Sequence, residues 1–197
     1  MLRVDLAIVQ CWVRPGSRVL DLGCGDGTLL EVLRDSRDIE GYGIEIDAEK
    51  ITQCVGRGIN VIEADVDHGL ADFPDKSFDT VLMTNSLQVL RRPDRVIAEM
   101  LRIGEECVVT FPNFGNIRTR LSLAAGGRMP VTRQLPYQWY DTPNIHFCTV
   151  RDFEELCRQQ QIRVLDREFV AEQFPDRLIK ATWPNLFCAT AIYHLAK

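Results

Sequence analysis

Stretches of consecutive apolar residues alternate along the chain with stretches in which apolar residues recur at helical spacing. The consecutive stretches are rich in β-branched residues and begin near Arg18, Gly41, Ile59, Phe78 and Glu106. Between them, the spacing of the apolar positions predicts helices over 28–37, 48–56 and 93–103. Strands that are apolar throughout are typical of a parallel sheet covered by helices on both faces. The pattern therefore predicts an α/β fold.

The last part of the chain predicts one further helix and two further strands. Thr149 and Asp152 have the spacing of a capping box, which marks the start of a helix. The two strand candidates that follow are 162–170 and 185–196. Between 112 and 148 the chain is interrupted by prolines and shows no clear period, so we expect an irregular connection there.

The first predicted strand ends in a glycine-rich turn, residues 23–27, that leads directly into the first predicted helix. Glycine has no Cβ, so a ligand can lie against the main chain there. Unpaired amides at a helix start also favour electron-rich ligand atoms. Glu45 follows Gly25 by 20 residues, at the end of the second predicted strand. In a strand–turn–helix–strand unit an acid at this position accepts hydrogen bonds from ribose hydroxyls. The sequence therefore predicts a nucleoside-containing cofactor.

The spacing of the glycines distinguishes between cofactors. A dinucleotide fingerprint is G-x-G-x-x-G, with a pyrophosphate at the helix start. Here the spacing is G-x-G-x-G, and Asp21 precedes it within the strand. This form resembles the first motif of class I S-adenosylmethionine (SAM)-dependent methyltransferases, and it disfavours an NAD-dependent oxidoreductase. The resemblance implies a Rossmann-like fold, with a mostly parallel seven-stranded sheet, helices on both faces and an antiparallel last strand.

The same resemblance implies which residues hold SAM or S-adenosylhomocysteine (SAH). Asp21 and the glycine turn would face the amino-acid end of SAM, and Glu45 would bind the ribose. Asp65 would accept the adenine amino group, with Glu63 as a substitute and a solvated turn as the alternative. The turn at 84–87 would close over the cofactor. The expected cofactor-binding residues are Asp21, Gly23, Cys24, Gly25, Gly27, Glu45, Ile46, Asp65 and Asn85.

No catalytic residue is identified. Methyl transfer from a sulfonium needs mainly positioning, and a general base helps only for some acceptors. His146 is the candidate base between 112 and 148, with a structural, hydrogen-bonded role as the alternative. Asn113 follows a proline, whereas amide-methylating enzymes have the order N-P-P-[YF], so that analogy fails. Asp79 is expected to be structural.

Composition bounds the remaining possibilities. A chain of 197 residues with 46% hydrophobic and 26% charged residues is typical of one soluble globular domain, here 1–197 with an insertion at about 112–148. The net charge of −5 argues against an electrostatic nucleic-acid binder. We find no stretch long enough for a membrane span and no signal peptide. Seven cysteines without C-x-x-C spacing indicate a reducing cytoplasm, with neither a disulfide framework nor a metal site.

The region from 112 to 148 is basic in an otherwise acidic chain. It carries one acid, Asp141, a cluster of aromatic residues at 137–140, and four arginines: Arg118, Arg120, Arg128 and Arg133. A solvated basic surface is one interpretation. The other is a contact for a carboxylate substrate or an acidic partner, because the guanidinium fork suits carboxylates.

Several stretches together resemble the MetW family of bacterial methionine-biosynthesis proteins: VLDLGCGDGTLL, GYGIEID, FPNFGNIRTRL, GRMPVT and LPYQWYDTPNIHFCT. The resemblance covers nearly the whole chain. It implies a SAM-binding, methyltransferase-like activating or regulatory subunit of a MetX-type homoserine O-acyltransferase. The alternative is a SAM-dependent methyltransferase that acts on an unidentified small molecule.

A physical hypothesis connects SAM binding with the association with an acyltransferase. SAM is made from methionine and so reports the end product of the pathway. We expect the glycine turn and Glu45 to sense SAM, and the segment 112–148 to form part of the partner surface. The expected effect of SAM on the acyltransferase is inhibition.

Overall fold

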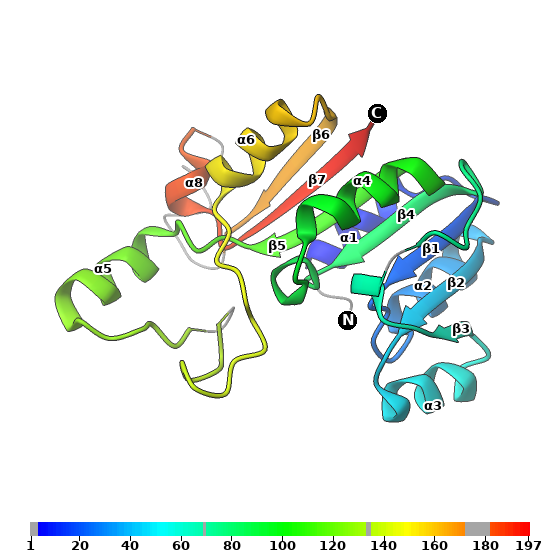
Figure 1. The fold of residues 1–197 in the computed structure, drawn as a ribbon, viewed down its shortest axis with the longest axis horizontal. Coiled ribbons are helices and arrows are strands. Elements are labelled where there is room, and N and C mark those ends of the chain that lie inside the picture. Colours follow the sequence, from blue (N-terminus) through cyan, green and yellow to red (C-terminus); the bar gives the residue numbers. More distant parts are fainter. Residues whose placement is uncertain (1–3, 69, 133–134, 172–181) are drawn as a thin grey trace.

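The computed structural model describes residues 4–68, 70–132, 135–171 and 182–197. Within them, one sheet has the strand order β3-β2-β1-β4-β5-β7-β6 (Figure 1). The strands are β1 (Arg18–Leu22), β2 (Glu40–Glu45), β3 (Asn60–Glu63), β4 (Phe78–Thr84), β5 (Gly104–Pro112), β6 (Arg163–Val170) and β7 (Thr190–Ala196). Neighbouring strands from β3 to β5 are parallel, and β7 is antiparallel to both β5 and β6. The mostly parallel seven-stranded sheet with an antiparallel last strand is therefore confirmed.

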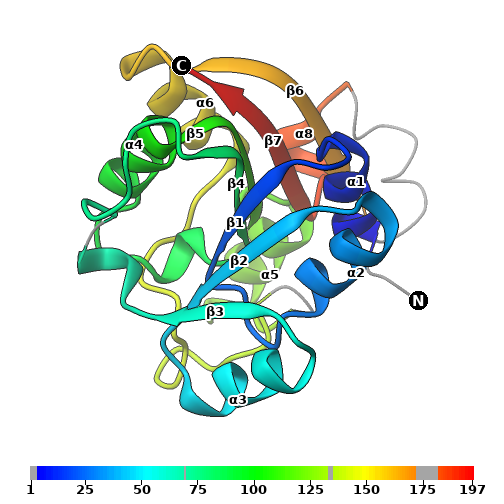
Figure 2. The same cartoon turned by 90° about the vertical axis from the view of Figure 1, so that its right-hand side faces the viewer.

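Helices cover both faces of the sheet. They are α1 (Val4–Trp12), α2 (Thr28–Arg37), α3 (Ala48–Gly56), α4 (Pro93–Ile103), α5 (Ile117–Gly126), α6 (Val150–Gln159) and α8 (Pro184–Phe187). Figure 2 shows α4 and α6 on one side of the sheet and α1 and α2 on the other. None of these helices, within the residues described, is long and apolar enough to cross a membrane.

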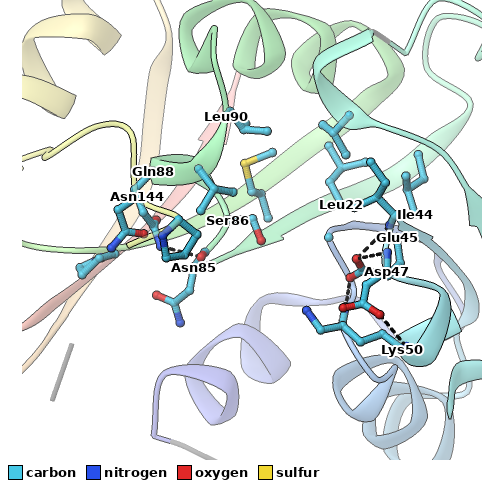
Figure 3. A pocket seen from close by; sticks show the side chains of 18 of the residues that line it. Leu22, Ile44, Glu45, Asp47, Lys50, Asn85, Ser86, Gln88, Leu90 and Asn144 are labelled. Carbon is cyan, nitrogen blue, oxygen red and sulfur yellow. Dashed lines mark hydrogen bonds between the residues drawn. The ribbon is translucent and has the colours of Figure 1, made fainter. Parts of the chain in front are cut away.

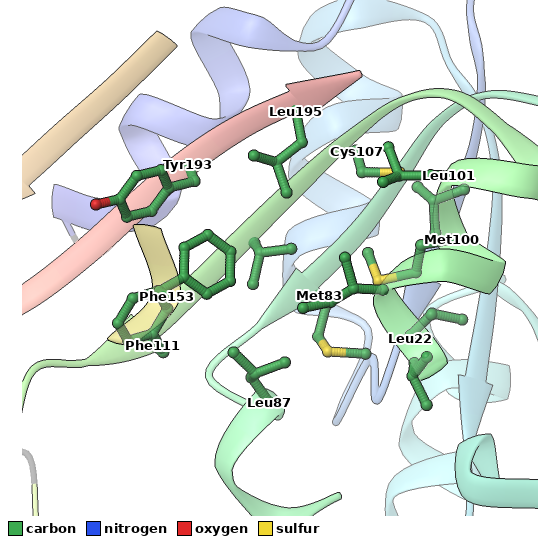
Figure 4. Close-up of a cluster of buried hydrophobic side chains, with 14 of the residues drawn as sticks. Leu22, Met83, Leu87, Met100, Leu101, Cys107, Phe111, Phe153, Tyr193 and Leu195 are labelled. Carbon is green, nitrogen blue, oxygen red and sulfur yellow. The ribbon is translucent and has the colours of Figure 1, made fainter. Parts of the chain in front are cut away.

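Alternation along β4 divides the core into two clusters. Val81 and Met83 pack with side chains of α4 and α6, whereas Leu82, between them, packs with side chains of α1 and α2. This is the period of two that a strand imposes on its side chains. The first cluster is drawn in Figure 4, and it includes the ring of Phe153, which lies 4.8 Å from Phe111 and 4.7 Å from Tyr193 between centroids.

Local signals placed several elements correctly. The predicted helices at 28–37, 48–56 and 93–103 have the same bounds as α2, α3 and α4. The capping box at the start of α6 is also confirmed. The hydroxyl of Thr149 accepts a hydrogen bond of 3.2 Å from the Asp152 amide, and the Asp152 carboxylate accepts one of 3.1 Å from the Thr149 amide.

Two expectations were wrong. The region 112–148 is not wholly irregular, because α5 forms inside it. Asn116 caps the start of α5 by accepting a hydrogen bond of 2.9 Å from the Arg118 amide, and Gly127 ends it at a φ of +59°. The strand expected over 185–196 begins only at Thr190, since the residues before it form the short helix α8.

Candidate functional site

A cavity of about 1110 Å³ opens at the carboxyl ends of the parallel strands. The strand order reverses between β1 and β4, and ligands of doubly wound sheets bind at such a reversal. Six of the nine expected cofactor-binding residues line the cavity: Gly23, Gly25, Glu45, Ile46, Asp65 and Asn85. The other three, Asp21, Cys24 and Gly27, are not among its lining residues.

Glu45 ends β2 and is 7% exposed. Its Oε2 accepts a hydrogen bond of 2.9 Å from the Gly25 amide, and its Oε1 accepts bonds of 2.9 Å and 3.0 Å from the amides of Ile46 and Asp47. The carboxylate therefore ties the glycine turn to the end of β2. A carboxylate offers about four lone-pair sites, so one site on Oε2 remains for a ligand hydroxyl.

The three glycines of the turn have different physical reasons to be glycine. All have positive φ, at +72° for Gly23, +59° for Gly25 and +77° for Gly27. A Cβ on Gly23 would lie 2.7 Å from the hydroxyl of Ser86, and one on Gly27 would lie 3.0 Å from the sulfur of Cys54. A Cβ on Gly25 would meet nothing within 4 Å. Gly25 thus leaves open space above the main chain, while the other two permit close packing.

Asp21 lies inside β1 and is 1% exposed. Burial, reinforced by the nearby charge of Glu45, raises the pKa of Asp21 from 3.8 to about 7. Its Oδ1 has no hydrogen-bond partner among the described residues. Asp21 is thus a buried carboxyl group that titrates near neutrality, outside the cavity lining.

Cys24 has a packing role. Its amide and that of Gly23 donate to the Ile44 carbonyl at 3.0 Å and 2.8 Å, and this holds the turn on β2. Its sulfur lies 3.8 Å from the sulfur of Cys54, and burial raises the pKa of the Cys24 thiol. A Cβ on Gly43 would clash with this sulfur. All seven cysteines are free thiols.

Asp65 and Asn85 also line the cavity. The Asp65 carboxylate accepts a hydrogen bond of 2.9 Å from the Asp67 amide. Glu63, the alternative, is exposed and does not line the cavity, which favours Asp65. Asn85 has a φ of +57°, and its side-chain amide donates to Asp5 of α1 at 3.4 Å.

Sequence reasoning missed part of the lining. Gln88, in the 3₁₀ turn η2 (Leu87–Val89), is 9% exposed, and its buried Oε1 has no partner in the described part of the chain. The amides of Ile145 and His146 donate to the Gln88 carbonyl at 2.9 Å and 3.0 Å. Figure 3 shows Gln88 beside Asn144, across the cavity from Glu45. A lone glutamine in a turn carries no signal that could have identified it.

Carboxylates dominate the charge of the cavity. Among the described residues, five acids and one basic residue line it: Asp5, Glu45, Asp47, Asp65 and Asp67, with Lys50. Such a lining favours a cationic ligand and disfavours one that carries phosphates.

Three other residues singled out in the sequence lie outside the cavity. His146 is not part of the lining, and its Nε2 lies 3.4 Å from the Arg91 carbonyl oxygen. Asp79 accepts a hydrogen bond of 2.7 Å from the Arg18 amide near the start of β4, away from the cavity. Asn113 donates to the Cys188 carbonyl at 3.0 Å and so joins the end of β5 to the chain before β7. The contacts of Asp79 and Asn113 join elements of the fold. Arg133 lies outside the described residues.

Solved structures resemble this fold. A SAM-dependent methyltransferase from Archaeoglobus fulgidus superposes with a TM-score of 0.69 and 18% identity, over 98% of this chain and 94% of that chain. A SAM-dependent methyltransferase from Mesorhizobium loti superposes with a TM-score of 0.66 and 16% identity, over 93% of this chain and 92% of that chain. The fold is therefore that of the class I SAM-dependent methyltransferases.

Sequence comparison identifies the family within this class. The profile of the family described as methionine biosynthesis protein MetW matches residues 3–195. A bifunctional methionine biosynthesis protein MetXA/MetW from Rhodopirellula baltica is 33% identical over 97% of this chain. The chain belongs to the MetW family. It spans 32% of the length of that bifunctional relative.

Proposed function

We propose that this protein binds SAM or SAH in the cavity and thereby regulates a MetX-type homoserine O-acyltransferase with which it associates. The observation that carries the proposal is the pairing of an open glycine turn with a carboxylate-lined cavity. SAM bears a sulfonium and an ammonium group, which suit that lining. The pyrophosphate of a dinucleotide does not suit it.

The residues present fit the cofactor. The free lone-pair site of Glu45 can accept a ribose hydroxyl, and Asp65 can accept the adenine amino group. Ile46 lines the cavity and is 63% exposed, so it offers an apolar surface to a base. Gly25 leaves room for the ligand against the main chain. Bound SAM supplies an electrophilic methyl group; the residues of this chain bind and orient it.

The association with an acyltransferase rests on the family relative. Its name joins MetXA to MetW in one chain, of which this protein matches about a third. SAM reports the end product of methionine synthesis, so we propose that it inhibits the acyltransferase in the complex. A coupling free energy of about 1–3 kcal/mol would change the partner affinity by about 5- to 150-fold. The free thiols and their spacing favour the cytoplasm as the site of this complex.

A second candidate function is methyl transfer to an unidentified small molecule. The observation that favours it is the extent of the cavity, which continues from the glycine turn to Tyr137, Asn144 and Thr190. Space beyond the cofactor is where a methyl acceptor would lie.

One set of experiments tests both candidates. Isothermal titration calorimetry with SAH and with NADH should show binding of SAH alone. Homoserine acylation by the purified MetX-type acyltransferase should rise when this protein is added and fall again as SAM is titrated. Unchanged acylation with and without this protein would refute the regulatory role. Turnover of SAM to SAH with a defined metabolite, in the absence of the acyltransferase, would favour the second candidate.

A further inference from the structure

Exposed apolar side chains gather in the segment between β5 and α6. Nine large apolar residues that are at least 39% exposed occur among the described residues of 117–147: Leu121, Leu123, Met129, Val131, Tyr137, Trp139, Tyr140, Ile145 and Phe147. Single exposed apolar residues are normal on a protein surface, so it is their concentration in one short segment that favours an interaction site. We call this group, with the exposed Arg128, the 117–147 surface.

The side chains of this surface are of the types that contribute most to protein interfaces. Trp139 is 74% exposed and Tyr140 is 71% exposed, and their rings meet edge to face at 5.7 Å. Tryptophan, tyrosine, methionine and arginine are enriched at interfaces, and the first two are frequent hot spots. Helix α5 buries only Thr119 among its ten residues and extends away from the sheet (Figure 1). Its remaining sides are open to a partner.

We propose that the 117–147 surface, through Trp139 and Tyr140, is where the homoserine O-acyltransferase docks. This inference rests on the proposed function. The occupant is argued from the bifunctional relative, in which a part named MetXA shares one chain with the part that matches this protein. A fusion keeps two parts at high effective concentration, and such an arrangement suits parts that contact each other. The segment is basic, because it carries several arginines, such as the exposed Arg128, and one acid, Asp141. We therefore expect an acidic counterpart on the acyltransferase.

The inner side of the same segment walls the cavity. Four of its residues line the cavity: Pro136, Tyr137, Pro143 and Asn144. The amides of the next two residues, Ile145 and His146, donate to the Gln88 carbonyl. A ligand in the cavity and a protein on the 117–147 surface therefore touch the same stretch of chain, and Tyr137 belongs to both. This gives a direct physical route by which SAM can alter docking.

The test compares variants of exposed residues. In the double variant Trp139→Ala/Tyr140→Ala we expect affinity for the purified acyltransferase to fall by about 30-fold or more, as for hot-spot residues. The matched control is Trp183→Ala. Trp183 is also well exposed, at 61%, but it follows α6 in the sequence and is not part of the 117–147 surface. SAH affinity, measured on each variant by calorimetry, should stay at the wild-type value and so show that the fold is intact. A charge reversal, Arg128→Glu, should also weaken docking and reduce its dependence on salt.

The outcomes separate this inference from the proposed function. If the wild type binds the acyltransferase and the double variant binds it equally well, the docking surface is wrong while the proposed function stands. An equal loss in Trp183→Ala also overturns the surface. If the wild type does not bind the acyltransferase, the proposed function itself fails. Light scattering on this protein alone tests whether a second copy occupies the surface. If the wild type is a dimer and the double variant is a monomer, the surface is a dimer interface and the proposal is refuted.

Discussion

Asp21 permits a prediction whose size follows from the structure. Burial raises the pKa of this carboxyl group from 3.8 to about 7, so the folded protein holds its proton over a range in which the unfolded chain has released it. The folded state therefore binds more protons between about pH 4 and pH 7, and its stability falls as the pH rises through that range. Asp21→Asn keeps the shape of the side chain and cannot ionise. From pH 5 to pH 8, the wild type should lose about 2.5 kcal/mol more stability than the variant.

Urea unfolding of both proteins at several pH values between 5 and 8 measures this difference. Asp26→Asn is the matched control, because the Thr28 hydroxyl and Arg57 lower the pKa of Asp26. The stability that ionised Asp26 contributes is lost only as the pH falls towards its lowered pKa. Between pH 5 and pH 8, the free energy of unfolding of Asp26→Asn should therefore change with pH in parallel with that of the wild type. Parallel curves for Asp21→Asn as well would refute the reasoning, since Asp21 would then ionise like an ordinary carboxyl group.

Further predictions concern the ligand and the core. Glu45→Ala should weaken SAH binding by about 1.5–3 kcal/mol in calorimetry, and an unchanged affinity would remove Glu45 from the site. Gly25→Ala should lose SAH affinity and only the stability that a φ of +59° costs an alanine, whereas Gly23→Ala, at a φ of +72°, should lose more stability because its Cβ would also meet the Ser86 hydroxyl at 2.7 Å. The reverse order would contradict this account of the turn. Phe153→Ala should cost about 3–5 kcal/mol in urea unfolding, and a loss below about 1 kcal/mol would show that its ring contacts stabilise little.

The part of the fold that the sequence predicted is the part with local signals. Helices α2 and α4 combine a buried face with identifiable ends. Helix α3 buries only Cys54, but its apolar positions keep a helical period and its start is marked by the Asp47 side chain, which accepts from the Glu49 amide. The position of Glu45 beside the glycine turn could be predicted because a strand, a turn and a helix fix its distance from Gly25 along the chain. The structure then brings the two together at 2.9 Å.

The parts that were missed depend on tertiary contacts or lack a buried face. The apolar positions of α5 do not gather on one face of the helix, so their period carries no signal, although Asn116 and Gly127 mark its ends. Helix α1 was not anticipated, and it supplies Asp5 to the cavity. Gln88 lines the cavity from η2, and its carbonyl accepts from the amides of Ile145 and His146; no pattern of neighbours in the sequence encodes that long-range contact.

The arrangement of cavity and segment imposes a thermodynamic constraint that can be measured. If SAM weakens docking of the acyltransferase by a given factor, the acyltransferase must weaken SAM binding by the same factor, because the two events share one coupling free energy. The SAM dissociation constant should therefore rise, by about 5- to 150-fold, when saturating acyltransferase is added. Calorimetry in both directions gives the two factors independently. In the wild type the two factors should be equal. If both fall towards one in Trp139→Ala/Tyr140→Ala, the coupling depends on the 117–147 surface. Unequal factors would show that SAM also binds elsewhere in the complex, and the cavity would then not be the site of regulation.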